Sequence, residues 1–176
     1  MTTRHLRRRD TTGLLGEPAL LGIYLNDHLA GATVGARLIR RITGAHQGTP
    51  AAPELARLTT EIAEDRRALM NVMGSLGVPV RRAKLVLGWA AELLGRLKPN
   101  GRLVRRSPLS SVIELEAMML GVEGKAACWR TLRRLAERER RLDGARLDAL
   151  LDRAAAQSRL LEELRVRAVD DIIGIP

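Results

Sequence analysis

Apolar residues recur at alternating spacings of three and four along four segments of the chain. This is the pattern of helices that bury one face. The first two stripes run Leu21, Tyr24, His28, Gly31, Gly35, Leu38, Ile42 and Leu55, Leu58, Ile62, Asp65, Leu69, Val72, Leu76. The last two run Val112, Leu115, Met119, Val122, Ala126, Trp129 and Leu147, Leu150, Ala154, Gln157, Leu161, Leu164, Ala168. The pattern predicts four amphipathic helices.

Turn and capping residues indicate where these helices begin and end. Pro18 and Pro108 suit first-turn positions, and Gly77 followed by Pro79 is a common helix end. Each helix would hold about 20 to 30 residues and extend about 30 to 45 Å. Short links join the first helix to the second and the third to the fourth, whereas residues 77–108 form a long crossover. We therefore expect an all-α four-helix bundle made of two helical hairpins.

The crossover contains the segment RRAKLVLGWAAELLGRLK, in which Leu85, Trp89 and Leu93 recur at four-residue steps. This spacing predicts a short extra helix. We expect its apolar face to dock on the bundle, and docking on a membrane interface is the alternative. The sequence therefore predicts a basic tail at 1–17, a bundle at 18–169 with its crossover at 77–108, and a C-terminal tail at 170–176.

Composition supports an all-helical core. The chain has no Phe, two Trp and one Tyr, so aliphatic side chains must fill the interior, and these suit helices better than sheets. Cys128 is the one cysteine, which excludes an internal disulfide and fits a reducing compartment. No export signal is evident, and no stretch approaches the roughly 18 apolar residues of a membrane span. We expect a cytoplasmic protein, or at most one peripheral to a membrane.

Each of the four helices carries a polar residue near its middle, on an otherwise largely apolar stripe. These residues are His28, Asp65 and Gln157, together with Glu123 on a second stripe of the third helix. That stripe runs Leu109, Ile113, Glu116, Leu120, Glu123, Ala127, Arg130. Because the midpoints of equally long helices share one layer, we expect the four polar groups to meet. An unpaired polar group there would cost about 1 to 3 kcal/mol.

Three further polar residues lie close enough in sequence to join this layer. Glu116 is two turns from Glu123, and Glu61 is one turn from Asp65. Tyr24 lies one turn from His28, where its hydroxyl could orient the imidazole.

The stretches YLNDHLAG, EIAEDRRAL and SPLSSVIELEAMMLGVEGKAACW, with the long crossover, make the chain resemble the ferritin-like superfamily. More particularly, it resembles a bacterial branch with degenerate metal-ligand motifs. The resemblance covers nearly all of residues 18–169 and rests on topology and inward acidic residues. In active members, two helices give one carboxylate each and two give a Glu-x-x-His pair, and these hold two iron or manganese ions.

The chain departs from that ligand pattern in two helices. Glu61 is followed three residues later by Glu64 instead of a histidine, and Gln157 is followed by Glu162. The other two histidines, His5 and His46, fall in a tail and a loop. We therefore do not expect a complete di-iron site.

Two interpretations of the central layer stay open. In one, the layer holds a single metal ion, and mixed imidazole and carboxylate ligands suit iron, manganese or zinc. Its candidate ligands are His28, Asp65, Glu116, Glu123 and Glu61. In the other, which we favour, His28 bonds Asp65 or Glu123 without metal, and Gln157 satisfies the remaining groups.

Small residues on the first and third helices also have two interpretations. Gly31 and Gly35 could let a ligand approach, but we favour close helix packing there. Gly121 and Gly124 flank Glu123 and leave the same choice open, with a local helix bulge as a third option.

The net charge of +10 is unevenly distributed. Basic residues gather in the N-terminal tail, in the run from Arg130 to Arg141, and above all in the crossover segment 81–106. The crossover bases are Arg81, Arg82, Lys84, Arg96, Lys98, Arg102, Arg105 and Arg106. Such a field attracts a lipid surface or a nucleic-acid backbone. With so few aromatic residues and no reading helix, sequence-specific nucleic-acid binding is not expected.

Two functions are consistent with these features. The favoured one is a structural or interaction protein that pairs through helix faces, as a homodimer, and meets an anionic partner through its basic crossover. The alternative is a metal-binding oxidoreductase or metal-handling protein. The balance of observations is against an enzyme.

Overall fold

The computed structural model describes residues 18–81 and 108–174. Within these residues the chain forms helices and no strand. The helices are α1 (Pro18–Ala45), α2 (Ala52–Leu76), α4 (Pro108–Leu135) and α5 (Gly144–Ile173). The prediction of an all-α four-helix protein is therefore confirmed. The predicted crossover helix and the tail 1–17 lie outside the described residues, and α5 continues past the predicted bundle end at residue 169.

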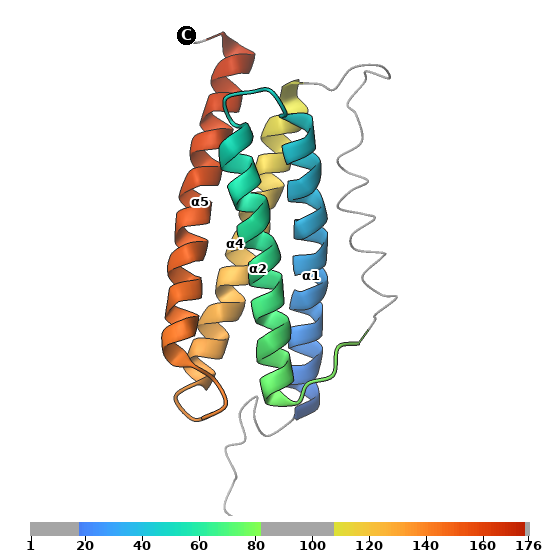
Figure 1. The fold of residues 1–176 in the computed structure, drawn as a ribbon, viewed down its shortest axis with the longest axis vertical. Coiled ribbons are helices and arrows are strands. Elements are labelled where there is room, and N and C mark those ends of the chain that lie inside the picture. The colour runs from blue at the N-terminus through green and yellow to red at the C-terminus, as the bar shows by residue number, and fades with distance from the viewer. Residues whose placement is uncertain (1–17, 82–107, 175–176) are drawn as a thin grey trace, which may run out of the picture.

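The four helices lie side by side with alternating directions (Figure 1). Helices α1 and α5 run one way along the long axis, and α2 and α4 run the other way. Helix α1 packs against α2 and α4, and α4 also packs against α5. Side-chain bonds from Arg153 to Glu64 and from Arg167 to Glu54 join α5 to α2. Each helix is therefore antiparallel to both of its neighbours.

Local capping explains where α2 and α5 end and begin. Gly77 has φ 70° and donates to the carbonyl of Gly74, while Val78 donates to Met73, which closes the last turn of α2. Asp143 precedes α5, and its carboxylate accepts from the backbone N–H of Arg146 at 3.1 Å.

The core consists of two aliphatic clusters, one towards each end of the bundle. One cluster includes Ile39, Leu58 and Leu161, and the other includes Leu25, Met73 and Trp129. Buried polar residues lie between them, at the level where Asp65 and Gln157 face each other. The polar layer expected from the sequence therefore has a physical counterpart that divides the core in two.

The buried amide of Asn26 holds the chain where it leaves α2. Its Nδ2 donates to the carbonyl of Gly22 at 2.7 Å and to that of Pro79 at 3.1 Å. Its Oδ1 accepts from the backbone N–H of Arg81 at 2.6 Å. The segment after α2 is therefore fixed against the first turns of α1.

Candidate functional site

The centre of the bundle contains a buried ion cluster around Asp65 of α2, whose residue is 2% exposed. Asp65 Oδ2 accepts from Lys125 Nζ of α4 at 2.6 Å and from Gln157 Nε2 of α5 at 3.2 Å. Its Oδ1 accepts from an arginine, Arg153 of α5, at 3.2 Å. One carboxylate thus connects three helices.

Lys125 and Gln157 complete the inner part of this cluster. The ammonium of Lys125 also donates to Gln157 Oε1. Gln157, itself 1% exposed, donates from Nε2 to Glu61 Oε2 at 3.0 Å. We name Asp65, Lys125 and Gln157 the central cluster.

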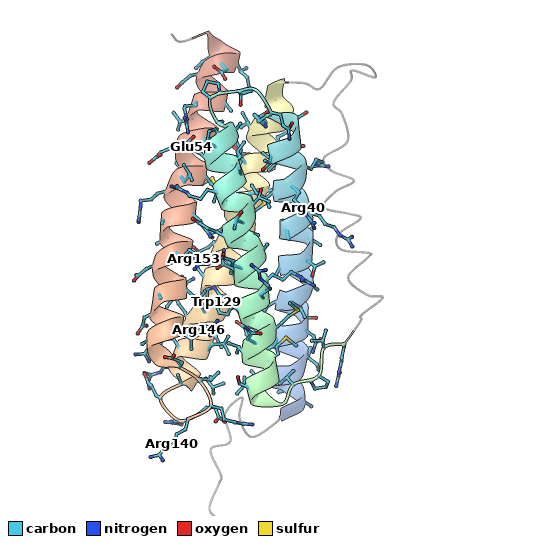
Figure 2. The ribbon with its side chains drawn as sticks, in the orientation of Figure 1. Arg40, Glu54, Trp129, Arg140, Arg146 and Arg153 are labelled. Carbon is cyan, nitrogen blue, oxygen red and sulfur yellow. The ribbon has the colours of Figure 1, made fainter. Side chains whose placement is uncertain are left out.

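Two side chains at the edge connect the central cluster to solvent. Arg153 lies at mid-height between α5 and α2, and its guanidinium also donates to Glu64 Oε2 at 3.0 Å (Figure 2). Both side chains are partly exposed. The carboxylate of Asp65 therefore faces a buried ammonium on one side and a half-exposed guanidinium on the other.

Burial and the carboxylate of Asp65 act in opposite directions on the pKa of Lys125. Removal from water lowers the pKa of its ammonium, and the nearby charge of Arg153 lowers it further. The charge and hydrogen bond of Asp65 raise it, and the net effect is a lowered pKa. A buried pair of this kind is costly to break, because the remaining charge has no water to solvate it.

The structure brings three of the sequence-predicted residues together. Asp65, Gln157 and Glu61 meet through direct hydrogen bonds. The residue from α4 is Lys125 and not Glu123, which is exposed and paired with Arg130. The two α4 residues are two positions apart, which places them about 200° apart around the helix.

The apolar spacing of α4 contains a signal for Lys125 that the prediction of Glu123 did not include. Lys125 follows Val122 by three positions and precedes Trp129 by four, so it lies on the same inward stripe as both. The second stripe, which supplied Glu123, faces outwards: Glu116 and Leu120 on it are exposed as well.

His28 lies away from the central cluster. The hydrogen bond from Arg66 to Thr33, at 3.0 Å, shows which part of α1 lies level with Asp65. His28 is five residues from Thr33, or about 7.5 Å along the axis. Its half-buried ring instead meets the edge of Tyr24, with ring centroids 4.5 Å apart, and the Tyr24 hydroxyl bonds Thr131 at 3.1 Å.

Because of His28, we expect the unfolding free energy of the protein to fall as the pH falls. Burial lowers its pKa, so the folded protein binds this proton less tightly than the unfolded chain. The contribution of neutral His28 to the unfolding free energy is fully present above the ordinary pKa of 6.5. It is lost as the pH falls towards and through the lowered pKa of the folded state. We expect the unfolding free energy to fall more steeply from about pH 7 to about pH 5 in the wild type than in His28→Gln. Urea unfolding at several pH values measures this, and equal slopes would contradict it.

Cys128 is a buried thiol in the cluster around Trp129. Burial raises its pKa to about 12. A thiol of this kind is protonated near neutral pH and is shielded from reagents. We expect a disulfide reagent to modify Cys128 only as fast as the protein opens, and at once in denaturant. Rapid modification of the folded protein, followed by absorbance, would show an accessible thiol.

The predicted close packing at Gly31 and Gly35 is not seen. A Cβ built at either position has nothing within 4 Å among the residues that the structure describes. The same holds for Gly121 and Gly124. These glycines lie on outward parts of α1 and α4, so helix contact within the described bundle does not explain them.

The predicted metal ligands do not converge on one point. Glu116 and Glu123 lie on the exposed side of α4, and His28 lies about a turn from the central layer. Within residues 18–81 and 108–174, no group of three or more His, Cys, Asp and Glu side chains is placed to hold a metal ion. The polar centre that does form joins Asp65 to an ammonium.

None of the helices described here combines the length and apolarity that crossing a bilayer requires. No family model, curated protein or solved structure matches the chain.

Proposed function

We propose that this chain is a structural or interaction protein, built on a ferritin-like bundle whose centre is closed by ion pairs. The observation that carries the proposal is the position of Lys125. Its ammonium donates to Asp65 at 2.6 Å and to Gln157, where side-chain oxygens of α2 and α5 converge. A metal ion bound to Asp65 would lie close to this ammonium, and like charges repel strongly where water is scarce. An internal cation therefore takes the role that a metal would have.

The ferritin-like part of the proposal is supported by the helix directions. Helices α2 and α4 run the same way, so the end of α2 at Leu76 and the start of α4 at Pro108 lie at opposite ends of the bundle (Figure 1). Two antiparallel hairpins joined by a crossover of this kind are the ferritin-like arrangement.

The alternative function, a metal-binding oxidoreductase or metal-handling protein, has one observation in its favour. Oxygen atoms of Asp65 and Gln157 both accept from Lys125 Nζ, and the carboxylate of Glu61 lies next to them, 3.0 Å from Gln157 Nε2. These oxygens would suit iron, manganese or zinc if Lys125 moved away.

Metal loading separates the two functions. The full chain is purified without an affinity tag or chelator, loaded anaerobically with Fe(II), Mn(II) or Zn(II), desalted and subjected to elemental analysis. We expect substoichiometric metal and an unfolding midpoint that a chelator leaves unchanged. Near-stoichiometric metal that Asp65→Ala abolishes and Glu123→Ala retains would overturn the proposal, because Glu123 is the exposed control.

Charge distribution supports an anionic partner. Residues 18–81 and 108–174 hold 19 basic and 17 acidic residues, whereas residues 1–17 and 82–107 hold 11 basic and 3 acidic residues. Nearly all of the positive excess therefore belongs to the tail and the crossover. A lipid surface or a nucleic-acid backbone fits such an excess.

Pairing with a second copy is proposed through the outward stripe of α4. Leu120 on this stripe is 74% exposed, and Leu109 is also exposed. We expect sedimentation equilibrium to show a dimer that Leu120→Arg converts to a monomer, because burying a guanidinium in an apolar contact is costly. Val166→Arg on α5 is the matched control. A monomeric wild type would remove this part of the proposal.

A further inference from the structure

One end of the bundle exposes apolar side chains from two different segments. Leu20 and Ile23 in the first turns of α1 are each 47% exposed, and Val80 after α2 is 52% exposed. The start of α1 and the end of α2 lie at the same end of the molecule (Figure 1). Asn26 fixes the segment containing Val80 against this part of α1.

Arginines without acidic partners lie at the same end. Arg81, Arg138, Arg140 and Arg146 are exposed, and none has a carboxylate within ion-pair distance among the described residues. Arg140 points away from the bundle in the link between α4 and α5, and Arg146 lies just beyond it in α5 (Figure 2). The link is joined to α2, since Arg141 donates to the carbonyl of Leu76 at 3.3 Å.

The acidic residues of the link between α4 and α5, and Asp148 in α5, are already engaged. Glu137 pairs with Arg134, and Glu139 pairs with Arg141. Asp143 caps α5 through the backbone N–H of Arg146. Asp148 forms an ion pair with Arg133. The unpaired guanidiniums therefore leave this end with a positive field.

The opposite end differs in the charged residues beside its exposed apolar side chains. It also exposes apolar side chains, Ile172 and Ile173, but these lie beside Asp170 and Asp171. Two nearby arginines of α5 are engaged, Arg165 with Glu162 and Arg167 with Glu54. We name the first end the basic end (Leu20, Ile23, Val80, Arg81, Arg138, Arg140 and Arg146).

We propose that the basic end docks on an anionic lipid bilayer. This inference rests on the proposed interaction role and names its partner. Guanidiniums are attracted by the negative surface potential of such a bilayer, and neighbouring apolar side chains can enter its interfacial region. The exposed Leu20, Ile23 and Val80 favour lipid over nucleic acid, because a phosphate backbone offers apolar side chains no comparable environment. The chain also has few aromatic residues on which bases could stack.

Vesicle co-sedimentation of the full chain tests the charge requirement. The vesicles are phosphatidylcholine alone, or equal parts phosphatidylcholine and phosphatidylserine. We expect binding only to the second kind, and a more than about tenfold loss in Arg138→Glu/Arg140→Glu. The matched control is Arg37→Glu/Arg159→Glu, which makes the same charge change at exposed arginines without ion-pair partners elsewhere on the bundle. We expect it to keep binding within about threefold.

A second pair of variants tests the apolar requirement. Ile23→Ser/Val80→Ser keeps every arginine and should still lose binding to the phosphatidylserine vesicles, whereas the exposed control Val166→Ser should not. Circular dichroism checks that each variant is folded. Equal losses in variant and control pairs would overturn the proposal, as would tighter binding to a DNA duplex than to the vesicles at the same salt concentration. Metal content, measured separately, reports on the central cluster, so the two proposals can fail independently.

Discussion

Replacing Asp65 with alanine is expected to lower the unfolding free energy by about 3 to 5 kcal/mol. The substitution removes the carboxylate that pairs with the buried ammonium of Lys125 at 2.6 Å. Gln157 would remain as an uncharged acceptor, and Arg153 would keep its bond to Glu64. The large cost comes from leaving Lys125 charged and unpaired in the core. Urea unfolding followed by circular dichroism measures it.

An exposed ion pair is the control for this result. Asp148→Ala breaks the pair between Asp148 and Arg133, both partly exposed to solvent. We expect a loss of at most about 1 kcal/mol, because water solvates the arginine that remains. Equal losses in the two variants would show that burial of the central cluster does not matter.

Apolar replacement of the whole cluster is a further check on the same explanation. The combination Asp65→Leu, Lys125→Met and Gln157→Leu removes both charges and the amide together. Exchanging a buried ion pair for packed apolar residues is often neutral or stabilising. We expect most of the stability lost in Asp65→Ala to return. Failure to recover would indicate that packing, and not the unpaired charge, explains the loss.

Replacing Trp129 with alanine is expected to cost about 3 to 5 kcal/mol. Trp129 is 1% exposed and is the largest side chain of its core cluster, where it packs with Leu25, Met73 and Leu132. Its removal leaves a cavity, and the packed helices around it can relax only partly to fill the space. Thermal and urea unfolding measure the loss.

Trp129→Phe separates the packing of this side chain from its polar atom. In the part of the chain that the structure describes, the buried Nε1 of Trp129 has no hydrogen-bond partner. Phenylalanine keeps most of the apolar volume and removes that unsatisfied donor, so we expect a cost below about 1.5 kcal/mol. A cost as large as that of alanine would mean that Nε1 has an important partner.

The helices could be predicted from the sequence because their signals are local. Apolar spacing, Pro18 and Pro108 at helix starts, and Gly77 at a helix end depend on a few neighbouring residues. Asp143 likewise caps α5 through its own backbone neighbourhood. Such features do not depend on how helices meet.

The central cluster could be predicted only in part because it depends on how each helix is rotated about its axis and on the height of each residue along the bundle. Asp65 and Gln157 each interrupt an otherwise apolar stripe, which identified them. Helix α4 has two candidate stripes, and sequence spacing alone did not show that the one with Lys125 faces inwards. A lysine is also easily taken for a surface residue, because its long stem can bury while its charge reaches water. His28 was misplaced because a shift of one helical turn lies within the error of a midpoint estimate.

The coupling free energy between Asp65 and Lys125 tests the central claim most directly. It is obtained from the unfolding free energies of the wild type, Asp65→Ala, Lys125→Met and the double variant. Because the pair is buried and the ammonium lies 2.6 Å from the carboxylate, we expect a coupling of about 2 kcal/mol or more. A value below about 0.5 kcal/mol, the level of independent sites, would contradict the claim that an ion pair closes the centre of the bundle.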